Sequence, residues 1–279
     1  MVNWDIAGDA VSAEAWDDLL RGFEYAQIFQ SHGWGEFKRR AGWQPLRLLA
    51  RDAGAPATAM AQVLIRTLPG GFRFAWVPGG PCLAAAADPQ AARAQLQGLL
   101  QQLRNTIGAH YLRCNFTFPA GQASADAVAG CLQRPAVRIG SGRSILLDVD
   151  ADDDAWLKSL TSKHRYYVRK ARNAALDWRY GNGASEIAAM AQLSRQLAKD
   201  KATTVGLFSQ DDLECLSALL RDHCRILVGY EHEQPVSACT VFHVGALAYY
   251  ASAATVGRGR ELSAAYAMMF ELRKRLCED

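Results

Sequence analysis

The sequence predicts an α/β protein with mixed sheets, built from two tandem half-domains. Short runs of alternating apolar residues, joined by glycine-rich turns, indicate hairpins of antiparallel strands. Longer stretches with apolar residues at spacings of three and four indicate helices between them. This succession of hairpin and helix occurs twice along the 279 residues. We therefore expect one half-domain over residues 1–142 and a second over residues 143–279.

The composition is typical of a globular protein rather than of a membrane or disulfide-rich one. Half of the residues are hydrophobic, which is enough for a sizeable core. No apolar run is long enough to span a membrane, and the first residues lack the features of a secretory signal, so we expect a cytoplasmic protein. The seven cysteines are scattered without C-x-x-C spacing, which indicates neither a disulfide framework nor a zinc site. A net charge of +3 is too small to require a nucleic-acid partner.

The first half is predicted to begin with helices and to continue with a hairpin, a long helix and a further strand. Pro69-Gly70-Gly71 supplies the positive φ angles that the hairpin turn needs. The region from Pro119 to Gly142 is rich in loop-forming residues and is expected to hold a short helix. The expected helices are 15–23, 33–40 and 89–107, and the expected strands are 45–51, 59–68, 72–77 and 110–116.

The second half is predicted to begin with the strand Arg143–Val149, which carries a run of aliphatic residues. A long helix from Asp152 to about Ala175 follows, with acidic residues in its first turn, where they interact favourably with the helix dipole. The later expected helices are 185–199, 210–221 and 261–276, and the later expected strands are 224–230, 235–243 and 246–253.

The two halves share a pattern of elements rather than a sequence. The segment Ala59–Pro81 and its following helix match Pro235–Ala254 and its following helix, but only the first copy continues into another strand. The second sheet is therefore expected to lack at least one strand. Strands joined by tight turns must be antiparallel, which argues against a doubly wound parallel sheet. Hairpin strands, then a helix, then a strand indicate half-domains of the acetyltransferase type.

The most polar segment is the basic run from Ser162 to Arg172. On a helix, Arg165, Arg169 and Arg172 share one face and form a cationic ridge. Arginine forks match the oxygens of phosphate groups, so the ridge indicates an anion-binding surface. A solvated basic helix face explains the charge pattern equally well.

A smaller basic group, Lys38-Arg39-Arg40, follows Trp34 at the end of an early helix. Cations are favourable at a helix C-terminus, and this ordinary role is the better explanation of the segment when it is taken alone.

The turn before the last helix resembles a coenzyme A pyrophosphate loop. Acetyltransferases bind that pyrophosphate on backbone N–H groups at a helix start. Arg260, Ser263 and Ala265 match the expected pattern except that serine replaces the first glycine. An ordinary loop that leads into a helix explains the same residues.

The sequence offers no pattern for covalent or metal-assisted catalysis. It contains no G-x-S-x-G, no H-E-x-x-H and no phosphate-binding P-loop, and its six histidines lie beside no obvious nucleophile. We expect a transfer reaction without a permanently bound cofactor or metal. The catalytic residue is not identified.

The order of several short motifs carries a resemblance to a known family. They are Phe29-Gln30-Ser31 with Trp34, Phe37 and Lys38; Gly42-Trp43; Trp76-Val77-Pro78-Gly79-Gly80-Pro81; Leu146-Leu147-Asp148-Val149; Arg165 with Val168, Lys170 and Ala171; and Tyr249-Tyr250-Ala251-Ser252-Ala253. With these motifs the sequence resembles the FemAB family of peptidoglycan bridge-forming aminoacyltransferases.

The resemblance implies two fused acetyltransferase-like domains that move an amino acid from aminoacyl-tRNA onto an amine of a peptidoglycan precursor. It places Lys38 and Arg165 where the family contacts the diphosphate of that precursor. The family continues past the last helix into further strands, so the resemblance implies that the second half-domain is incomplete. The substrate-binding side chains expected on this basis are Lys38, Arg165, Trp34, Lys163 and Arg169.

Three functions follow from these observations. The first is transfer of an aminoacyl or acyl group to an amine of a nucleotide-linked or lipid-linked envelope precursor, with aminoacyl-tRNA or acyl-CoA as donor. The second is an acyl-CoA-dependent N-acyltransferase, indicated by the turn at Arg260. The third is a catalytically inactive substrate-binding module.

Overall fold

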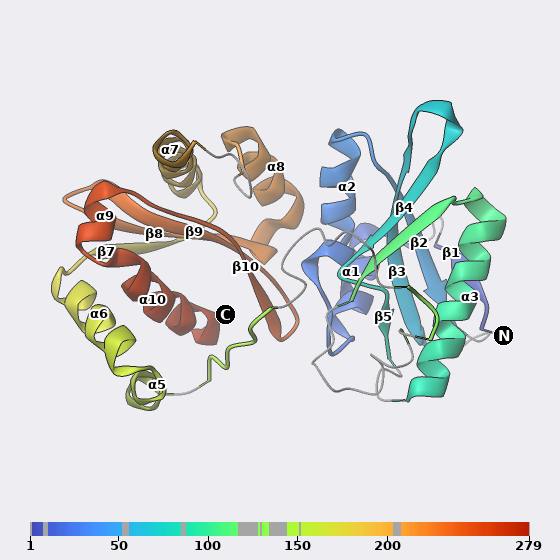
Figure 1. Cartoon of the computed structure of the whole chain (residues 1–279), viewed down its shortest axis with the longest axis horizontal. Helices are drawn as coiled ribbons and strands as arrows, with labels where there is room; N and C mark the ends of the chain where they lie inside the picture. The colour runs from blue at the N-terminus through green and yellow to red at the C-terminus, as the bar shows by residue number, and fades with distance from the viewer. Residues whose placement is uncertain are drawn as a thin grey trace. The chain divides into compact units, whose positions relative to one another are not determined.

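The computed structural model describes residues 2–7, 11–51, 56–84, 88–116, 128, 130–133, 144–150, 152–202 and 208–278. The chain divides into two compact units, Met1–Gly142 with His243–Leu247 and Arg143–Phe242 with Ala248–Asp279. Each unit is a twisted sheet with helices packed on it (Figure 1). The chain is therefore an α/β protein with two mixed or antiparallel sheets, as the sequence predicts.

The first unit contains a six-stranded sheet in the order β1-β2-β3-β4-β6, with β5 paired to β3. Its strands are β1 (Trp4–Ile6), β2 (Gln44–Ala50), β3 (Ala59–Thr67), β4 (Arg73–Pro78), β5 (Cys82–Leu83) and β6 (Tyr111–Asn115). Strands β2, β3 and β4 are antiparallel, whereas β6 is parallel to β4, with Phe74 opposite Tyr111. A parallel neighbour requires a crossover, and the helix between β5 and β6 supplies it.

That crossover helix is α3 (Pro89–Ile107), whose bounds match the sequence prediction. It begins where the side chain of Asp88 accepts hydrogen bonds from the first turn, and it ends at Gly108 in the left-handed conformation. Its apolar face packs on one side of the sheet through Leu96, Leu99 and Leu103. The remaining helices of this unit are α1 (Ala13–Arg21), the short η1 (Ile28–Gln30), α2 (His32–Arg40) and the turn η2 (Pro69–Gly71).

The second unit contains a four-stranded sheet in the order β10-β9-β8-β7. Its strands are β7 (Asp177–Gly181), β8 (Cys224–Glu231), β9 (Gln234–Val244) and β10 (Leu247–Thr255). Its helices are α5 (Asp153–Ser159), α6 (Ser162–Asn173), α7 (Ala184–Lys201), α8 (Gln210–Leu220), η3 (Arg221–His223), α9 (Gly257–Glu261) and α10 (Ala264–Glu278). Met190 of α7 belongs to one apolar cluster of this sheet and Met268 of α10 to another.

One predicted helix is divided in the structure, and another begins later than predicted. The helix expected over 152–175 is interrupted at Leu160, which is extended, and restarts where the Thr161 hydroxyl accepts a hydrogen bond from His164 N. A threonine N-cap therefore begins a new helix that the sequence reading missed. The helix predicted over 261–276 corresponds to α10, which begins three residues later, after Ser263 with its φ of 60°. The short helix α9 before it was not predicted.

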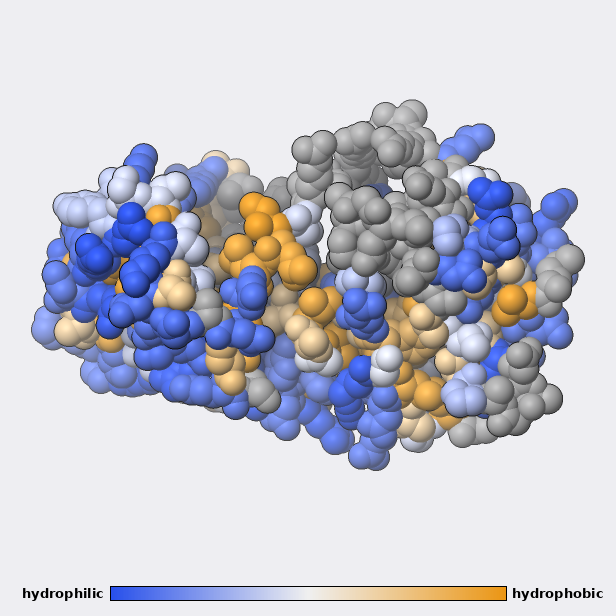
Figure 2. All heavy atoms as spheres, turned by 90° about the horizontal axis from the view of Figure 1, so that it is seen from below, coloured by the Kyte–Doolittle hydropathy of each residue, from blue (hydrophilic) through white to orange (hydrophobic). Residues whose placement is uncertain are grey.

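The strand predicted over 143–149 is wrong for the residues that the structure describes. Residues 144–150 form no strand, and Ile145, Leu146 and Leu147 are 87%, 76% and 56% exposed. Hydrophobic residues also reach the surface on the face of the molecule that Figure 2 draws. A strand requires a neighbour for its backbone hydrogen bonds, and none of the described strands pairs with this segment. The short strand β7, which the sequence reading missed, instead forms one edge of the sheet.

The predicted succession of antiparallel strands followed by a helix occurs in both units. In the first unit β4, α3 and β6 follow in order, whereas no strand among the described residues follows α10. The expected helix within 119–142 lies outside the described residues. Among the helices that the structure describes, none is long and apolar enough to cross a membrane.

Candidate functional site

In the first unit the candidate side chains are carried by α2. Helix α2 begins where the Ser31 hydroxyl accepts a hydrogen bond from Trp34 N at 3.2 Å. Gly35 lets the helix approach the sheet closely, because a Cβ there would collide with the side chain of Gln62 on β3. The Ser31 cap therefore sets the residue at which the helix begins, and the contact at Gly35 sets its distance from the sheet.

Lys38 is held over a small aromatic cluster on the same helix. Its Nζ lies 4.8 Å from the ring centre of Trp34 and 5.2 Å from that of Phe37. Trp34 is only 5% exposed and also meets Phe29 edge to face at 4.9 Å. The structure thus brings two predicted site residues together, with the indole supporting the ammonium group of the half-buried Lys38 by a cation–π contact.

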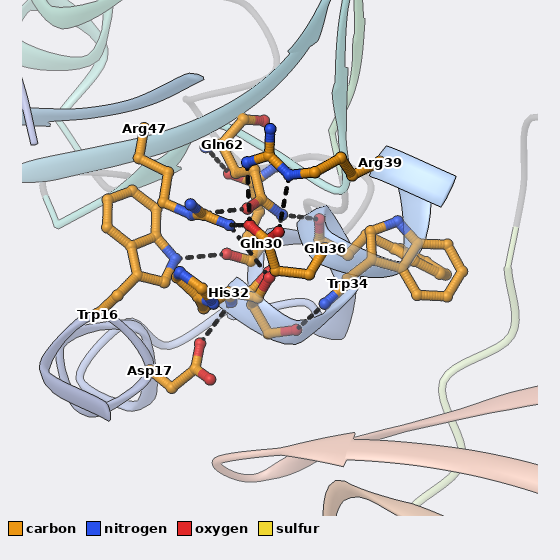
Figure 3. Close-up of polar contacts among 11 residues, drawn as sticks. Trp16, Asp17, Gln30, His32, Trp34, Glu36, Arg39, Arg47 and Gln62 are labelled. Carbon is orange, nitrogen blue, oxygen red and sulfur yellow. Dashed lines mark hydrogen bonds and ion pairs between the residues drawn. The ribbon is translucent and has the colours of Figure 1, made fainter. Parts of the chain in front are cut away.

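A buried polar network connects α2 to the sheet (Figure 3). Gln30 is fully buried, and its amide donates to Pro78 O at 2.7 Å while its oxygen accepts from Gln62 N at 2.7 Å. The Gln62 side chain donates to Ser31 O at 2.7 Å and accepts from Arg47 Nε at 3.0 Å. Because each of these amide groups is satisfied, the network fixes the position of the α2 start without leaving its glutamines unpaired.

Charge in this network is concentrated on Glu36, which pairs with Arg39 at 2.8 Å and with Arg47 at 2.9 Å. The hydrogen bond from Arg39, together with that from Arg47, lowers the pKa of Glu36 to about 2. Burial, followed by the charge of Arg47, lowers the pKa of His32. The sequence reading missed this network, although a glutamine within the apolar run of β3 is a signal for a buried partner.

In the second unit the basic helix α6 carries the other predicted substrate-binding residues. The three guanidinium groups of the expected ridge have different surroundings. Arg165 donates from Nη1 to Leu157 O at 3.2 Å and to Lys158 O at 3.0 Å, so it caps the C-terminal end of α5. Arg172 lies over the ring of Phe270 at 4.7 Å. These two arginines therefore have structural contacts.

Lys163 and Arg169 on the same helix are exposed, and within the described part of the chain no hydrogen bond or ion pair involves either side chain. Beside them Tyr167 stacks on Tyr266 of α10 at 4.9 Å, and His164 lies 5.7 Å from the same ring. The exposed surface of α6 therefore carries available cations, and other positions of the helix carry aromatic rings. This combination is suited to an anionic ligand.

The turn between β10 and α10 holds the residues that matched the coenzyme A pattern. Arg260 pairs with Asp200 at 2.9 Å, so its guanidinium has a carboxylate partner. Ser263 is buried at a positive φ, and Ala265 lies in the first turn of α10. Gly259 approaches β9 so closely that a Cβ there would collide with Val236 O. These contacts form a tightly packed turn before the first residue of α10.

Four of the seven cysteines have thiols that burial makes less reactive. Burial raises the pKa of Cys82, Cys114, Cys224 and Cys239 to about 12, so these thiols are protonated near neutral pH and are poor nucleophiles. Among the residues that the structure describes, no group of three or more His, Cys, Asp or Glu side chains is placed to hold a metal ion.

Comparison with solved structures identifies the architecture. A crystal structure of FemX matches with a TM-score of 0.79 at 13% sequence identity, covering 96% of this chain and 85% of the FemX chain. The chain has the FemX fold. That fold spans both units, which agrees with the internal repeat of strands and helices and with the FemAB-like resemblance of the sequence.

Two further structures match only about half of the chain. A probable acetyltransferase has a TM-score of 0.35 and 16% identity, covering 53% of this chain and 99% of its own. A transcriptional regulator from Bacillus halodurans C-125 has a TM-score of 0.33 and 13% identity, covering 52% and 100%. These scores are too low to support an argument. No protein-family model matches the sequence, and no curated protein matches it significantly.

Proposed function

We propose that this chain is a FemX-like acyltransferase that moves an aminoacyl or acyl group onto an amine of a cell-envelope precursor in the cytoplasm. The observation that carries the proposal is the match to FemX over nearly the whole chain. The exposed cations of α6 and the ring-supported Lys38 add to it, because a nucleotide-linked or lipid-linked precursor presents a diphosphate.

In the proposed reaction the acceptor amine attacks the carbonyl carbon of the donor ester or thioester. A new C–N bond forms, the C–O or C–S bond breaks, and the amine proton leaves with the oxygen or sulfur leaving group. No enzyme nucleophile is needed, which agrees with the protonated thiols of the buried cysteines Cys82 and Cys239. Rate enhancement then comes from holding the two substrates in line and from donors that stabilise the oxyanion.

Each unit carries its own proposed contacts to the acceptor. Lys38, supported by Trp34, is the proposed anion contact of the first unit. The α6 residues Lys163, Arg165 and Arg169 are the proposed anion contacts of the second unit. Arg165 retains donors beyond the Nη1 atom that caps α5. The donor is aminoacyl-tRNA or acyl-CoA, and the turn with Arg260, Ser263 and Ala265 is the proposed contact for an acyl-CoA donor.

Calorimetric binding of a UDP-linked muramyl peptide tests the acceptor. We expect Arg169→Ala to weaken binding about fivefold or more, because a charge-assisted hydrogen bond contributes at least about 1 kcal/mol. Arg195→Ala is the matched control, since Arg195 is an exposed arginine on α7 rather than on α6. Undiminished binding by Arg169→Ala would remove α6 from the proposed site.

Turnover assays with the same precursor distinguish the donors. Incubation with aminoacyl-tRNA or with acetyl-CoA, followed by mass spectrometry of the precursor, is expected to show acylation with one donor. Precursor binding without product from either donor would instead support the inactive binding module. Acylation of simple amines by acetyl-CoA without precursor binding would support the N-acyltransferase.

A further inference from the structure

The hairpin between β3 and β4 ends in an exposed apolar turn bracketed by two arginines. Residues 66–73 read Arg-Thr-Leu-Pro-Gly-Gly-Phe-Arg, and all of them are exposed. The turn is closed by a hydrogen bond from Leu68 N to Phe72 O at 2.7 Å. Figure 1 shows this hairpin reaching beyond the neighbouring strands of its sheet.

The tip of the hairpin presents its two large apolar side chains to solvent. Leu68 and Phe72 are each 41% exposed. A Cβ added at Gly70 or Gly71 would meet no atom within 4 Å, so the backbone at these two glycines is uncovered. One side of the Phe72 ring stacks on His110 at 5.1 Å, and the ring stays partly exposed. Paired apolar side chains on a projecting turn cost solvation free energy in water, and such surfaces mark interaction sites.

The sequence around the tip carries positive charge only. Arg66 and Arg73 lie on the strands at either side of the turn, and no aspartate or glutamate occurs within residues 53–87 or 89–125. On the neighbouring strand Tyr111 is 45% exposed and stacks on Phe74 at 5.4 Å. The apolar side chains of the tip, the two arginines beside it and the exposed Tyr111 therefore occur on neighbouring strands of one sheet.

We propose that this hairpin docks the protein on an anionic membrane surface. Leu68 and Phe72 enter the boundary between headgroups and acyl chains, where burial of apolar area provides affinity. Arg66 lies over Trp43, and Arg73 donates from Nη1 to Ile107 O. Both arginines keep further N–H donors for the lipid phosphates, which attract cations at the surface of an anionic leaflet. Tyr111 occupies the headgroup region, as tyrosine does at membrane interfaces.

The charge pattern separates this hairpin from the other exposed apolar run of the chain. Ile145, Leu146 and Leu147 are at least as exposed, but Asp148 and Asp150 follow them closely. Carboxylates are repelled by an anionic surface, so that run is unsuited to the same partner. A free phosphate would engage the arginines alone and would leave the apolar tip in water.

The inference does not depend on acyl transfer, and docking stands even if the chain transfers no group. If the proposed function also holds, docking would bring the protein to the surface where a lipid-linked acceptor resides. Membrane binding and turnover are therefore measured separately, so that failure of one is distinguishable from failure of the other.

Vesicle flotation of the full chain tests the proposal. We expect co-flotation with vesicles of phosphatidylcholine and phosphatidylglycerol in a ratio of about 7:3, and much less with phosphatidylcholine alone. The double variant Leu68→Ser/Phe72→Ser is expected to lower the partition coefficient about tenfold or more, since membrane affinity scales with buried apolar area. Arg66→Gln is expected to lower it about fivefold at low salt. All three side chains are exposed, so thermal melts should match wild type.

Two matched controls define the alternatives. Leu146→Ser removes a more exposed leucine from the acidic run, and Arg195→Gln removes one exposed positive charge from α7; both should float as wild type does. If Leu146→Ser lowered the partition coefficient as much as the Leu68→Ser/Phe72→Ser variant does, exposed apolar residues in general would bind the vesicles. That result would overturn the assignment to the hairpin. The proposal would also be overturned if the wild-type protein floated equally well with neutral and anionic vesicles, or with neither. Release of the protein from anionic vesicles by inorganic phosphate would overturn it too.

Discussion

The two units contain the same succession of antiparallel strands and a following helix, but they differ on the outer side of the last hairpin strand. In the first unit β4 is flanked by β3 and by the parallel strand β6. In the second unit β10 pairs with β9 alone among the described strands. Val77 on β4 is fully buried, whereas Tyr249 and Tyr250 on β10 are 41% and 42% exposed.

This difference shows that an apolar run becomes a strand only where a neighbour accepts its backbone hydrogen bonds. The segment at Ile145 has the composition of a strand, yet it is irregular and exposed, and none of the described strands pairs with it. The segment at Tyr111 has a similar length and forms β6, because β4 is beside it.

The units also differ in how their helices are held. The first unit positions α2 through buried amide and guanidinium groups, whereas the second packs α5, α6 and α10 around the ring of Phe270. Substitutions in each unit test this contrast.

Phe270→Ala is expected to give the largest effect, a loss of about 4 kcal/mol in the free energy of unfolding. The ring is fully buried, meets Trp156 edge to face at 5.6 Å, and packs with Leu157 and Val168. Urea denaturation measures the loss, and hydrogen exchange should place it in the second unit. Met269→Ala, at a half-buried position of the same helix, is the control and should cost less.

Gln30→Ala is expected to cost about 3 kcal/mol, because it leaves buried backbone groups without partners. The lost contacts are those to Gln62 N, Gln62 O and Pro78 O. Urea denaturation followed by hydrogen exchange should show the loss in the first unit. Gln192→Ala, at an exposed position of α7, should change stability by less than about 0.5 kcal/mol. Equal effects of the two substitutions would contradict a structural role for the network.

Glu36→Gln is expected to cost about 2 kcal/mol at neutral pH, because it leaves the mostly buried Arg47 without its carboxylate. The arginine hydrogen bonds lower the pKa of Glu36 from 4.5 to about 2. A carboxyl group with a lowered folded-state pKa stabilises the protein above its unfolded pKa and loses this contribution as the pH falls through the folded value. The difference between wild type and variant should therefore shrink between about pH 4.5 and about pH 2.

Denaturation midpoints at several pH values measure this trend. Glu14→Gln, at an exposed position of α1, provides the comparison. A wild-type advantage that stays constant down to about pH 2 would contradict the ion pairs at Glu36.

The sequence predicted most of the fold because its signals are local. The N-cap Asp88 and the glycine at 108 define α3, and Pro69-Gly70-Gly71 defines the β3–β4 turn. What it missed depends on tertiary partners or on weak signals. The break at Thr161 is one threonine cap inside a continuous helical pattern, and the failed strand at Ile145 depends on a neighbour that local sequence does not specify.

The candidate site was predicted only in part, for a similar reason. Helical spacing correctly placed Arg165, Arg169 and Arg172 on one helix, but spacing carries no information about which guanidinium caps α5 or covers Phe270. Likewise, adjacency predicted that Lys38 lies near Trp34, whereas the hydrogen bond between Gln30 and Gln62 joins residues 32 positions apart. Substrate-binding roles for these residues stay predictions.

Leu146→Ser is expected to give the smallest effect, less than about 0.5 kcal/mol, because the side chain is 76% exposed and buries little area. Val77→Ser, at a fully buried position of β4, should cost several times more, although both sites lie in strand-like sequences. Parallel urea titrations compare the two. If Leu146→Ser instead cost more than about 1 kcal/mol, the segment would be buried in solution, and a strand partner would exist for it. Equal losses of stability for Leu146→Ser and Val77→Ser would contradict the contrast between the two units. A much smaller loss for Leu146→Ser would support it, and β10 would keep one side without a described neighbour.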